Sequence, residues 1–192
     1  MPMNITKTVS LCLSFLITIS VCSCNSGRKK QTENENIEIF IHNTITEMEN
    51  ENMGKQIVNT KVYFGTDSIN QTTLHELTNI PRLFFYFSNN TCPPCIDQSV
   101  EIIKEIFNDY ESNEKIIFIS PDYPLRYSNN CYGKKLLKLK NENLGLPIED
   151  GFQPPFFIII NMDMKVESIH VVNKMDFERT REYLVRISEI LI

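Results

Sequence analysis

The feature that most constrains the fold is a pair of cysteines two residues apart, Cys92-Pro93-Pro94-Cys95. An apolar run, Leu83–Phe87, precedes the pair. A pattern of apolar residues at helical spacing follows, from Ile96 to about Tyr110. A short apolar run predicts a buried strand, and the later spacing predicts an amphipathic helix. The sequence therefore predicts a strand, a short loop and a helix, with the cysteines where the helix begins.

Cysteines at the start of a helix have a predictable chemistry. The first turn has unpaired backbone N–H groups and the positive end of the helix dipole, and both favour a thiolate over a thiol. The thiolate is the reactive form of cysteine. Cys95 follows Cys92 by one turn, so it is placed to attack a mixed disulfide formed by Cys92. The motif predicts thiol–disulfide exchange with Cys92 as nucleophile and Cys95 as resolving thiol. The redox group is this pair, and no separate cofactor is expected.

The N-terminal segment resembles an export signal. Val9–Val21 carries no charge, follows Lys7, and is short for a membrane span, which needs about 20 apolar residues. It ends in Val-Cys-Ser-Cys, which resembles a bacterial lipobox whose last cysteine becomes lipidated. We therefore predict that residues 1–23 are removed and that Cys24 carries the lipid. The alternatives are an ordinary signal peptide, or lipidation at Cys22.

The remaining chain is expected to form one domain held at a membrane. Residues 24–36 are polar and predict a flexible tether, and residues 37–192 are long enough for a single domain with a sizeable core. The formal charge of −5 gives no reason to expect nucleic acid as a partner. Export places the domain in the periplasm or cell-envelope space, where disulfides can persist. A redox pair there needs its own electron partner, which the sequence does not identify.

Apolar patterning predicts an α/β order along the domain. The segment 37–48 fits either a helix or a strand, and we favour the helix. The next expected elements are a strand at 57–64, a turn at 65–68, a helical turn at 72–77 and a strand at 81–87. After the helix that follows the cysteines, we expect a strand at 116–120, a loop at 122–130 and a helix at 134–144. The chain should end with strands at 156–160 and 165–172, joined by a hairpin, and a last helix capped by Asp176. Helices between strands imply parallel pairs, and the hairpin implies one antiparallel pair. The predicted fold class is α/β with a central mixed sheet flanked by helices.

This order resembles the thioredoxin fold, and the signal, the lipobox and the segment 65–68 resemble the membrane-tethered TlpA/ResA-like branch of that superfamily. The resemblance covers about residues 54–192. Cys92 matches the family's nucleophile, Cys95 the resolving thiol and Pro94 the proline before it; Pro93 completes the loop. Pro155, at the start of an apolar strand, matches the family's cis-proline. The resemblance implies a thiol–disulfide oxidoreductase that acts on the thiols and disulfides of exported proteins.

The sequence departs from the family pattern in three places. Thr91 stands where the family usually has Trp, and the chain contains no Trp. Gln98 stands where this branch often has a buried Glu that accepts a proton. If Pro155 is cis, Pro154 has no backbone N–H with which to bind substrate; alternatively Pro154 is cis and Gln153 binds it. Pro93 and Pro94 also remove amides that stabilise a Cys92 thiolate, which favours a reductant over an oxidant.

Other chemistries compete for the cysteine pair. A zinc site needs four ligands, and only Cys131, His42, His75 and His170 remain, without a second close pair. No metal site is therefore predicted. A static disulfide is possible, and the main alternative is a copper- or protein-binding module on the same scaffold, with His170 as a distant ligand. Cys131 is either a third redox thiol or a buried, inert one.

Overall fold

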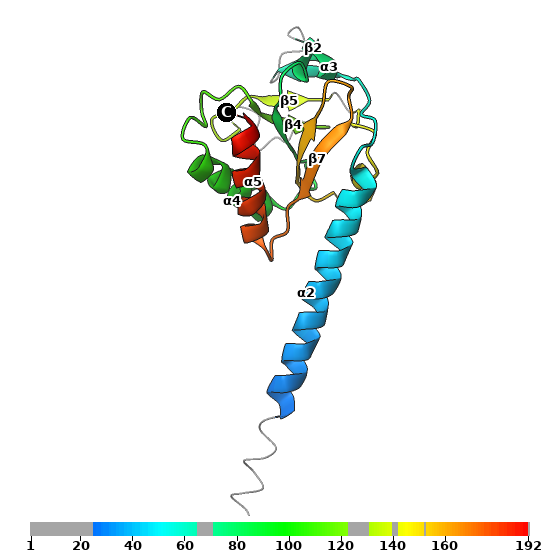
Figure 1. Cartoon of the computed structure of the whole chain (residues 1–192), viewed down its shortest axis with the longest axis vertical. Coiled ribbons are helices and arrows are strands. Elements are labelled where there is room, and N and C mark those ends of the chain that lie inside the picture. The colour runs from blue at the N-terminus through cyan, green and yellow to red at the C-terminus, as the bar shows by residue number, and fades with distance from the viewer. Residues whose placement is uncertain (1–24, 65–70, 123–130, 140–141, 152, 192) are drawn as a thin grey trace, which may run out of the picture. The chain divides into compact units, whose positions relative to one another are not determined.

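The computed structural model describes residues 25–64, 71–122, 131–139, 142–151 and 153–191 (Figure 1). The predicted signal segment with Cys24, the turn at 65–68 and most of the loop at 122–130 lie outside these residues. Within the described part of the chain, every helix is too short or too polar to cross a membrane.

The chain divides into two compact units, residues 1–45 and residues 46–192. Helix α2, Asn25–Asn52, supplies the described residues of the first unit and contributes its last turns to the second. A helix was favoured for residues 37–48, and the structure has one there. The helix also covers most of the segment 24–36, for which composition favoured a flexible tether. Half of residues 25–36 are Arg, Lys, Gln or Glu, and all four are good helix formers.

The second unit is built on one sheet of seven strands, in the order β2-β1-β5-β4-β3-β6-β7. The strands are β1 (Lys61–Phe64), β2 (Gln71–Thr73), β3 (Leu83–Tyr86), β4 (Ile116–Ser120), β5 (Leu136–Lys138), β6 (Phe156–Ile160) and β7 (Val166–Val171). The helices are α3 (Leu74–Leu77), α4 (Pro93–Ile106), α5 (Phe177–Leu191) and a short 3-10 helix, η2 (Pro147–Glu149).

The four strands in the middle and at one edge of the sheet contain the pairing that the sequence implied. β3 and β4 are parallel and are joined by α4, while β6 is antiparallel to β3 and to β7. Because β3 and β6 run in opposite directions, the C-terminal end of β3 lies beside the N-terminal end of β6. The loop that carries Cys92 and the segment that carries Pro155 therefore lie next to each other, at this end of the sheet.

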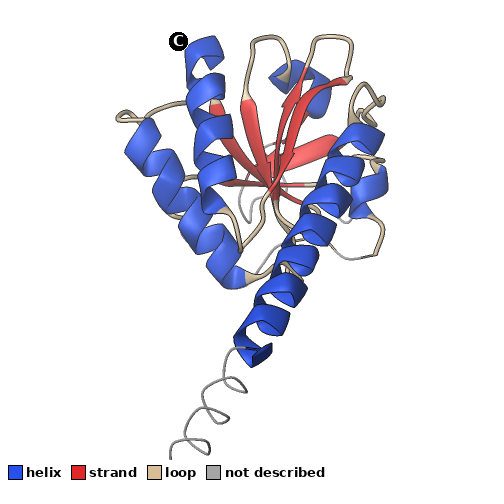
Figure 2. Cartoon of the chain, turned by 60° about the horizontal axis from the view of Figure 1, so that its bottom comes forward, coloured by secondary structure: helices blue, strands red, loops and turns tan. Residues whose placement is uncertain are grey.

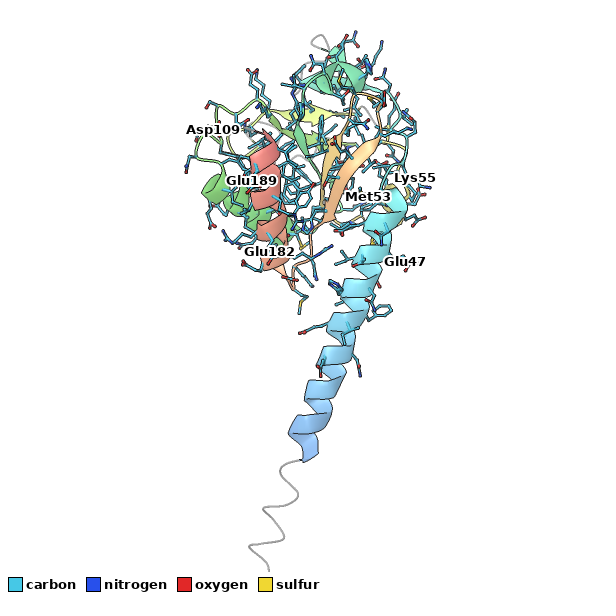
Figure 3. All side chains as sticks on the ribbon, in the orientation of Figure 1. Glu47, Met53, Lys55, Asp109, Glu182 and Glu189 are labelled. Atoms are coloured by element: carbon cyan, nitrogen blue, oxygen red, sulfur yellow. The ribbon has the colours of Figure 1, made fainter. Side chains whose placement is uncertain are left out.

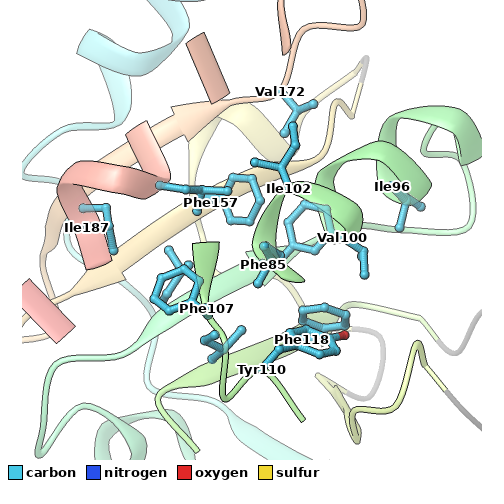
Figure 4. Close-up of a cluster of buried hydrophobic side chains, with 14 of the residues drawn as sticks. Phe85, Ile96, Val100, Ile102, Phe107, Tyr110, Phe118, Phe157, Val172 and Ile187 are labelled. Carbon is cyan, nitrogen blue, oxygen red and sulfur yellow. The ribbon is translucent and has the colours of Figure 1, made fainter. Parts of the chain in front are cut away.

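The main core lies between the sheet and the helices α4 and α5, which are side by side on one of its faces (Figure 1 and Figure 2). Phe85 and Phe157 stack there with ring centroids 4.5 Å apart, and Ile187 of α5 faces them from the other side of the core (Figure 4). Alternate residues of a strand point to opposite faces. All four residues of β3 are nevertheless buried, so this strand is covered on both faces.

Helix α5 has the amphipathic pattern that the sequence predicts. Asp176 caps it, because its Oδ1 accepts a hydrogen bond from the backbone N–H of Arg179 at 3.1 Å. Leu184 is buried against the sheet. Glu182 and Glu189, which Figure 3 labels on the same helix, are exposed.

The prediction of a helix over residues 134–144 was wrong. Leu136–Lys138 form strand β5, which pairs with β4 in parallel and with β1 in antiparallel orientation. Helical spacing over so short a segment is weak, and the unpaired edge of β4 offers backbone hydrogen bonds that a strand can satisfy. The predicted strand at 57–64 is shorter than expected, since only Lys61–Phe64 pair as a strand.

Candidate functional site

Cys92 occupies the N-cap position of α4, after a short loop that leaves β3. Its carbonyl oxygen accepts hydrogen bonds from the N–H groups of Cys95 at 3.0 Å and Ile96 at 3.3 Å. Pro93 and Pro94 fill the first turn, where a missing N–H costs little because that group has no intrahelical partner. Both prolines are exposed. The sequence thus places the two thiols one turn apart at a stiff, accessible helix start.

The two thiols differ in their access to solvent. Cys92 is half-buried, whereas Cys95 is only 5% exposed, and both are free thiols. Burial, followed by the hydrogen bond and the charge of the neighbouring Cys92, raises the pKa of Cys95 to about 12. Cys95 follows Cys92 by one helical turn, so its sulfur is placed to attack that of Cys92. The arrangement has an outer thiol that a substrate can reach and an inner thiol that only Cys92 can meet.

A network of hydrogen bonds holds the loop before Cys92 in place. Ser88 N–H donates to Thr91 Oγ1 at 2.9 Å, and Ser88 Oγ donates to Gln153 Oε1 at 2.8 Å. The hydroxyl of Thr91 donates to the carbonyl of Gln153 at 3.3 Å, and Gln153 Nε2 donates to the carbonyl of Glu149 at 2.9 Å. Gln153, predicted to bind substrate, thus uses its side chain to hold the cysteine loop.

The cis-proline that the resemblance implied is not found. Among the described residues no peptide bond is cis, so Pro155 and Pro154 both follow trans bonds. The trans form of an X–Pro bond is favoured by about 0.5–1 kcal/mol unless the surroundings impose the other. Both prolines are buried, and Gln153 is half-buried. The segment lies beside the cysteine loop, but it presents little surface to a substrate.

A second loop, residues 172–176, follows β7 and lies at the same end of the sheet as Cys92. Val172 N–H donates to the carbonyl of Pro155 at 2.9 Å, which joins this loop to the segment beside Cys92. Phe177, at its end, packs against the hydrophobic cluster that Cys92 also contacts. Lys174 is exposed, and its positive charge offsets a small part of the rise in the Cys95 pKa that burial causes. Sequence reasoning missed Lys174 because only the antiparallel pairing of β6 and β7 brings it to the cysteines.

Gln98 and Asp97, near the start of α4, are not placed like the buried Glu that accepts a proton in the family. Gln98 is exposed. Asp97 is half-buried and accepts a hydrogen bond from the hydroxyl of Tyr132. The carbonyl of Tyr132 accepts a hydrogen bond from the hydroxyl of Tyr110 at 2.8 Å. The hydrogen bond to Asp97 joins Tyr132 to α4, and the one from Tyr110 joins it to the segment that follows α4.

Cys131 is 1% exposed and lies in the main hydrophobic cluster. Burial raises the pKa of its thiol to about 12, so the reactive thiolate is scarce at neutral pH. These properties are those of an inert core cysteine, which was one of the two interpretations of the sequence.

His170 lies in β7 and is 3% exposed. Its Nε2 is 2.9 Å from Thr180 Oγ1, and its Nδ1 is 3.5 Å from Glu49 Oε1. Glu49 also accepts from the N–H of Val171 at 2.8 Å and pairs with Arg179. Both ring nitrogens of His170 are therefore engaged by the protein. Within the described residues, no three His, Cys, Asp or Glu side chains gather in a way that could hold a metal ion.

The burial of His170 predicts a pH-dependent stability. Burial, followed by the charges of Arg179 and Arg186, lowers its pKa to about 3. Below the ordinary pKa of about 6.5, the unfolded chain binds a proton that the folded chain excludes, so unfolding becomes easier as pH falls from about 6.5 towards 3. One such proton changes the free energy of unfolding by about 1.4 kcal/mol per pH unit. Urea unfolding at pH 7, 6 and 5 measures this slope.

His170→Gln should flatten that slope, because the amide cannot take up the proton. The matched control is His75→Gln, since His75 is exposed and its replacement should leave the slope unchanged. Equal slopes in the wild-type protein and His170→Gln would contradict the prediction.

Comparisons with known proteins concern the fold. No protein-family model matches the sequence, and no curated protein matches it. A thioredoxin-like protein from Porphyromonas gingivalis is 17% identical, with a TM-score of 0.47, covering 71% of this chain and 93% of that one. One from Bacteroides caccae is 20% identical, with a TM-score of 0.44, covering 79% and 56%. The thioredoxin domain of a thiol-disulfide oxidoreductase from Bacteroides vulgatus is 16% identical, with a TM-score of 0.39, covering 68% and 98%.

The topology of the chain itself shows the fold. A parallel β3–α4–β4 unit stands beside an antiparallel β6–β7–α5 unit, and the cysteine pair lies where α4 begins. This order of strands and helices is the thioredoxin-like fold that the resemblance in the sequence implied.

Proposed function

We propose that the protein is a thiol–disulfide oxidoreductase that reduces disulfides of exported proteins through Cys92 and Cys95. The observation that carries the proposal is the unequal pair of thiols at the start of α4. Cys92 is accessible, while Cys95 is buried against it with a pKa raised to about 12. A static disulfide or a buried structural pair needs no accessible member, whereas exchange with a second molecule does.

The proposed reaction consists of two exchanges. The Cys92 thiolate attacks one sulfur of a substrate disulfide; a mixed disulfide forms, the substrate disulfide breaks, and the first substrate thiolate leaves and takes a proton from solvent. Cys95 then loses its proton and attacks the sulfur of Cys92. The Cys92–Cys95 disulfide forms, and the second substrate thiolate leaves and is protonated. Two electrons have passed to the substrate, and an external dithiol returns the protein to its reduced form.

The reductive direction is supported by the first turn of α4. Pro93 and Pro94 have no N–H groups to donate to the sulfur of Cys92, so a thiolate there has fewer hydrogen bonds than at an ordinary helix start. A less stabilised thiolate gives its electrons up more readily, and strong oxidants in this class depend on a stabilised reduced form.

The location of the protein is part of the proposal. A leader that ends in Val-Cys-Ser-Cys supports export and a lipid on Cys24, which would hold the domain at a bacterial membrane in the periplasm or cell-envelope space. The partners would then be exported proteins with disulfides, and a dithiol reductant in the same compartment.

Equilibration with glutathione tests both the function and its direction. The protein is incubated in buffers of increasing oxidised glutathione, quenched with acid and alkylated, and the dithiol and disulfide forms are counted by mass spectrometry. We expect one Cys92–Cys95 couple with a potential below about −200 mV, in the range of reducing members of this class.

A potential near −120 mV would refute the reductive direction, because that value is typical of a strong oxidant. Failure of Cys92 and Cys95 to form a disulfide in any buffer would refute the function itself. Cys131→Ser serves as the control and should have an unchanged potential, since Cys131 is buried in the core.

A further inference from the structure

We propose that Asn52, at the end of α2, positions Cys92 through a path of hydrogen bonds and thereby helps to set the reduction potential of the cysteine pair. This inference rests on the proposed function, because a reduction potential belongs to a thiol pair that forms a disulfide. Residues 46–52, the last turns of α2, belong to the same compact unit as the cysteines. The proposed path therefore lies within one unit.

Asn52 joins the end of α2 to the short helix η2. Its side chain donates to the carbonyl of Met48 at 2.7 Å, and its Oδ1 accepts from the N–H of Ile148 at 3.2 Å. Asn52 is 1% exposed and Ile148 is 3% exposed, so water does not replace this bond easily. Because a buried N–H without a partner is costly, the bond to Asn52 holds η2 at the end of α2.

The helix η2 in turn holds Gln153. The carbonyl of Glu149, the last residue of η2, accepts from Gln153 Nε2 at 2.9 Å. The carboxylate of Glu149 is buried and accepts the N–H groups of Leu144 and Leu146, each at 2.9 Å. These bonds tie η2 to the segment before it, so the carbonyl that Gln153 uses has a fixed place.

Gln153 extends the path to the loop that carries Cys92. Its Oε1 accepts from Ser88 Oγ at 2.8 Å, and its carbonyl accepts from Thr91 Oγ1 at 3.3 Å. Ser88 and Thr91 are both buried, and Thr91 directly precedes Cys92. The path from Asn52 to Cys92 therefore consists of hydrogen bonds joined by short pieces of backbone.

A second contact of α2 reaches the same segment. Glu49 Oε1 accepts from the N–H of Val171 at 2.8 Å, and the N–H of the next residue, Val172, donates to the carbonyl of Pro155 at 2.9 Å. Gln153 and Pro155 are thus both held by bonds that lead back to the end of α2. Because the contact of Glu49 remains when Asn52 is replaced, we expect a smaller effect from Asn52 than from Gln153.

The hydrogen bonds of the loop before Cys92 affect the balance between the dithiol and the disulfide. Forming the Cys92–Cys95 bond restricts this loop, and restricting a loop costs conformational entropy. A loop that is already held has less entropy to lose, so the network favours the disulfide and makes the pair a stronger reductant. Loosening the loop should therefore make the potential less negative.

The test measures the equilibrium of the full chain with glutathione, by acid quench, alkylation and mass spectrometry. The main variant is Asn52→Ser, because a serine hydroxyl in a helix can bond to the carbonyl four residues earlier, here that of Met48, but is too short to reach Ile148. We expect the equilibrium constant for forming the Cys92–Cys95 disulfide to fall about threefold, which is about 14 mV. Asn52→Ala should give a similar fall, and Gln153→Ala a fall of about tenfold, or about 30 mV.

A double variant, Asn52→Ser with Gln153→Ala, shows whether the two residues act along one path. We expect its equilibrium constant to equal that of Gln153→Ala alone, because that substitution already cuts the path. The matched control is Asn161→Ala. Asn161 also accepts backbone N–H groups, from Asp163 and Lys165, but it lies at the opposite end of β6 from the cysteine loop, so its replacement should leave the equilibrium unchanged.

Urea unfolding of each variant establishes that it is folded and how much stability it has lost. A wild-type equilibrium constant in Asn52→Ser and Asn52→Ala would overturn the inference. Additive shifts in the double variant would also overturn it, and so would a fall in Asn161→Ala as large as that in Asn52→Ser. Failure of the wild-type pair to form a disulfide in any buffer would instead overturn the proposed function.

Discussion

Replacing Cys92 with serine is expected to abolish the reduction of insulin disulfides, with a loss on the order of a thousand-fold or more. The hydroxyl cannot form the mixed disulfide, and Cys95, at 5% exposed and with a pKa near 12, cannot take over from it. The measurement is the turbidity of insulin chains released in the presence of dithiothreitol, compared with dithiothreitol alone.

Cys95→Ser should give a different failure from Cys92→Ser. Cys92 still attacks, but no thiol resolves the product, so the substrate stays attached through Cys92. Non-reducing gels and mass spectrometry would show this adduct in Cys95→Ser and not in Cys92→Ser. Cys131→Ser should reduce insulin like the wild-type protein, because Cys131 lies in the core. An adduct through Cys95 in the Cys92→Ser variant would contradict the assigned order of the two thiols.

The second large effect is expected from Phe157→Ala, which should lower the free energy of unfolding by about 3–5 kcal/mol. Phe157 is fully buried in β6, stacks on Phe85 at 4.5 Å and lies 6.2 Å from the ring of Tyr183. Its removal leaves a cavity between the sheet and α5 that the surrounding strands cannot close. Urea unfolding followed by circular dichroism measures the change.

Met162→Ala is the control for this prediction. Met162 follows β6 in the hairpin turn and is 71% exposed, so its truncation should change the free energy of unfolding by less than about 0.5 kcal/mol. Similar losses for the two variants would show that the stacked rings are not the centre of the core.

The parts of the fold that sequence could predict are those with strong, local patterns. The apolar runs at 83–87, 116–120 and 156–160 became β3, β4 and β6, and the helical spacing after Cys95 became α4. Asp176 caps α5 as its position before an amphipathic segment implied. Each of these signals comes from residues close together in the chain, so one sequence is enough to read it.

The errors concern elements that depend on distant partners. Leu136–Lys138 forms a strand because β4 and β1 offer it hydrogen bonds on both sides, which no pattern within 134–144 records. The prolines at 154 and 155 are trans, although the resemblance implied that one is cis. A peptide configuration depends on the surroundings of the bond, and a short motif does not carry that information.

The candidate site shows the same division. The cysteine pair was evident from four residues. Gln153 acquires its place when β6 pairs with β3, and Lys174 acquires its place when β7 pairs with β6, because these pairings bring residues that are distant in the sequence to the cysteine loop. Sequence spacing alone carries no sign of the Ser88–Gln153 hydrogen bond, or of a lysine whose charge reaches Cys95.

The burial of Cys131 has a consequence for biosynthesis. Under the export that we propose, a new chain would enter an oxidising space with the thiols of Cys92, Cys95 and Cys131, and a wrong bridge to Cys131 would block folding. Cys92 and Cys95 are separated by a short loop whose closure is entropically cheap, whereas reaching Cys131 requires a much longer one. Once the core has formed, Cys131 is withdrawn from oxidants, so folding itself protects the chain against mispairing.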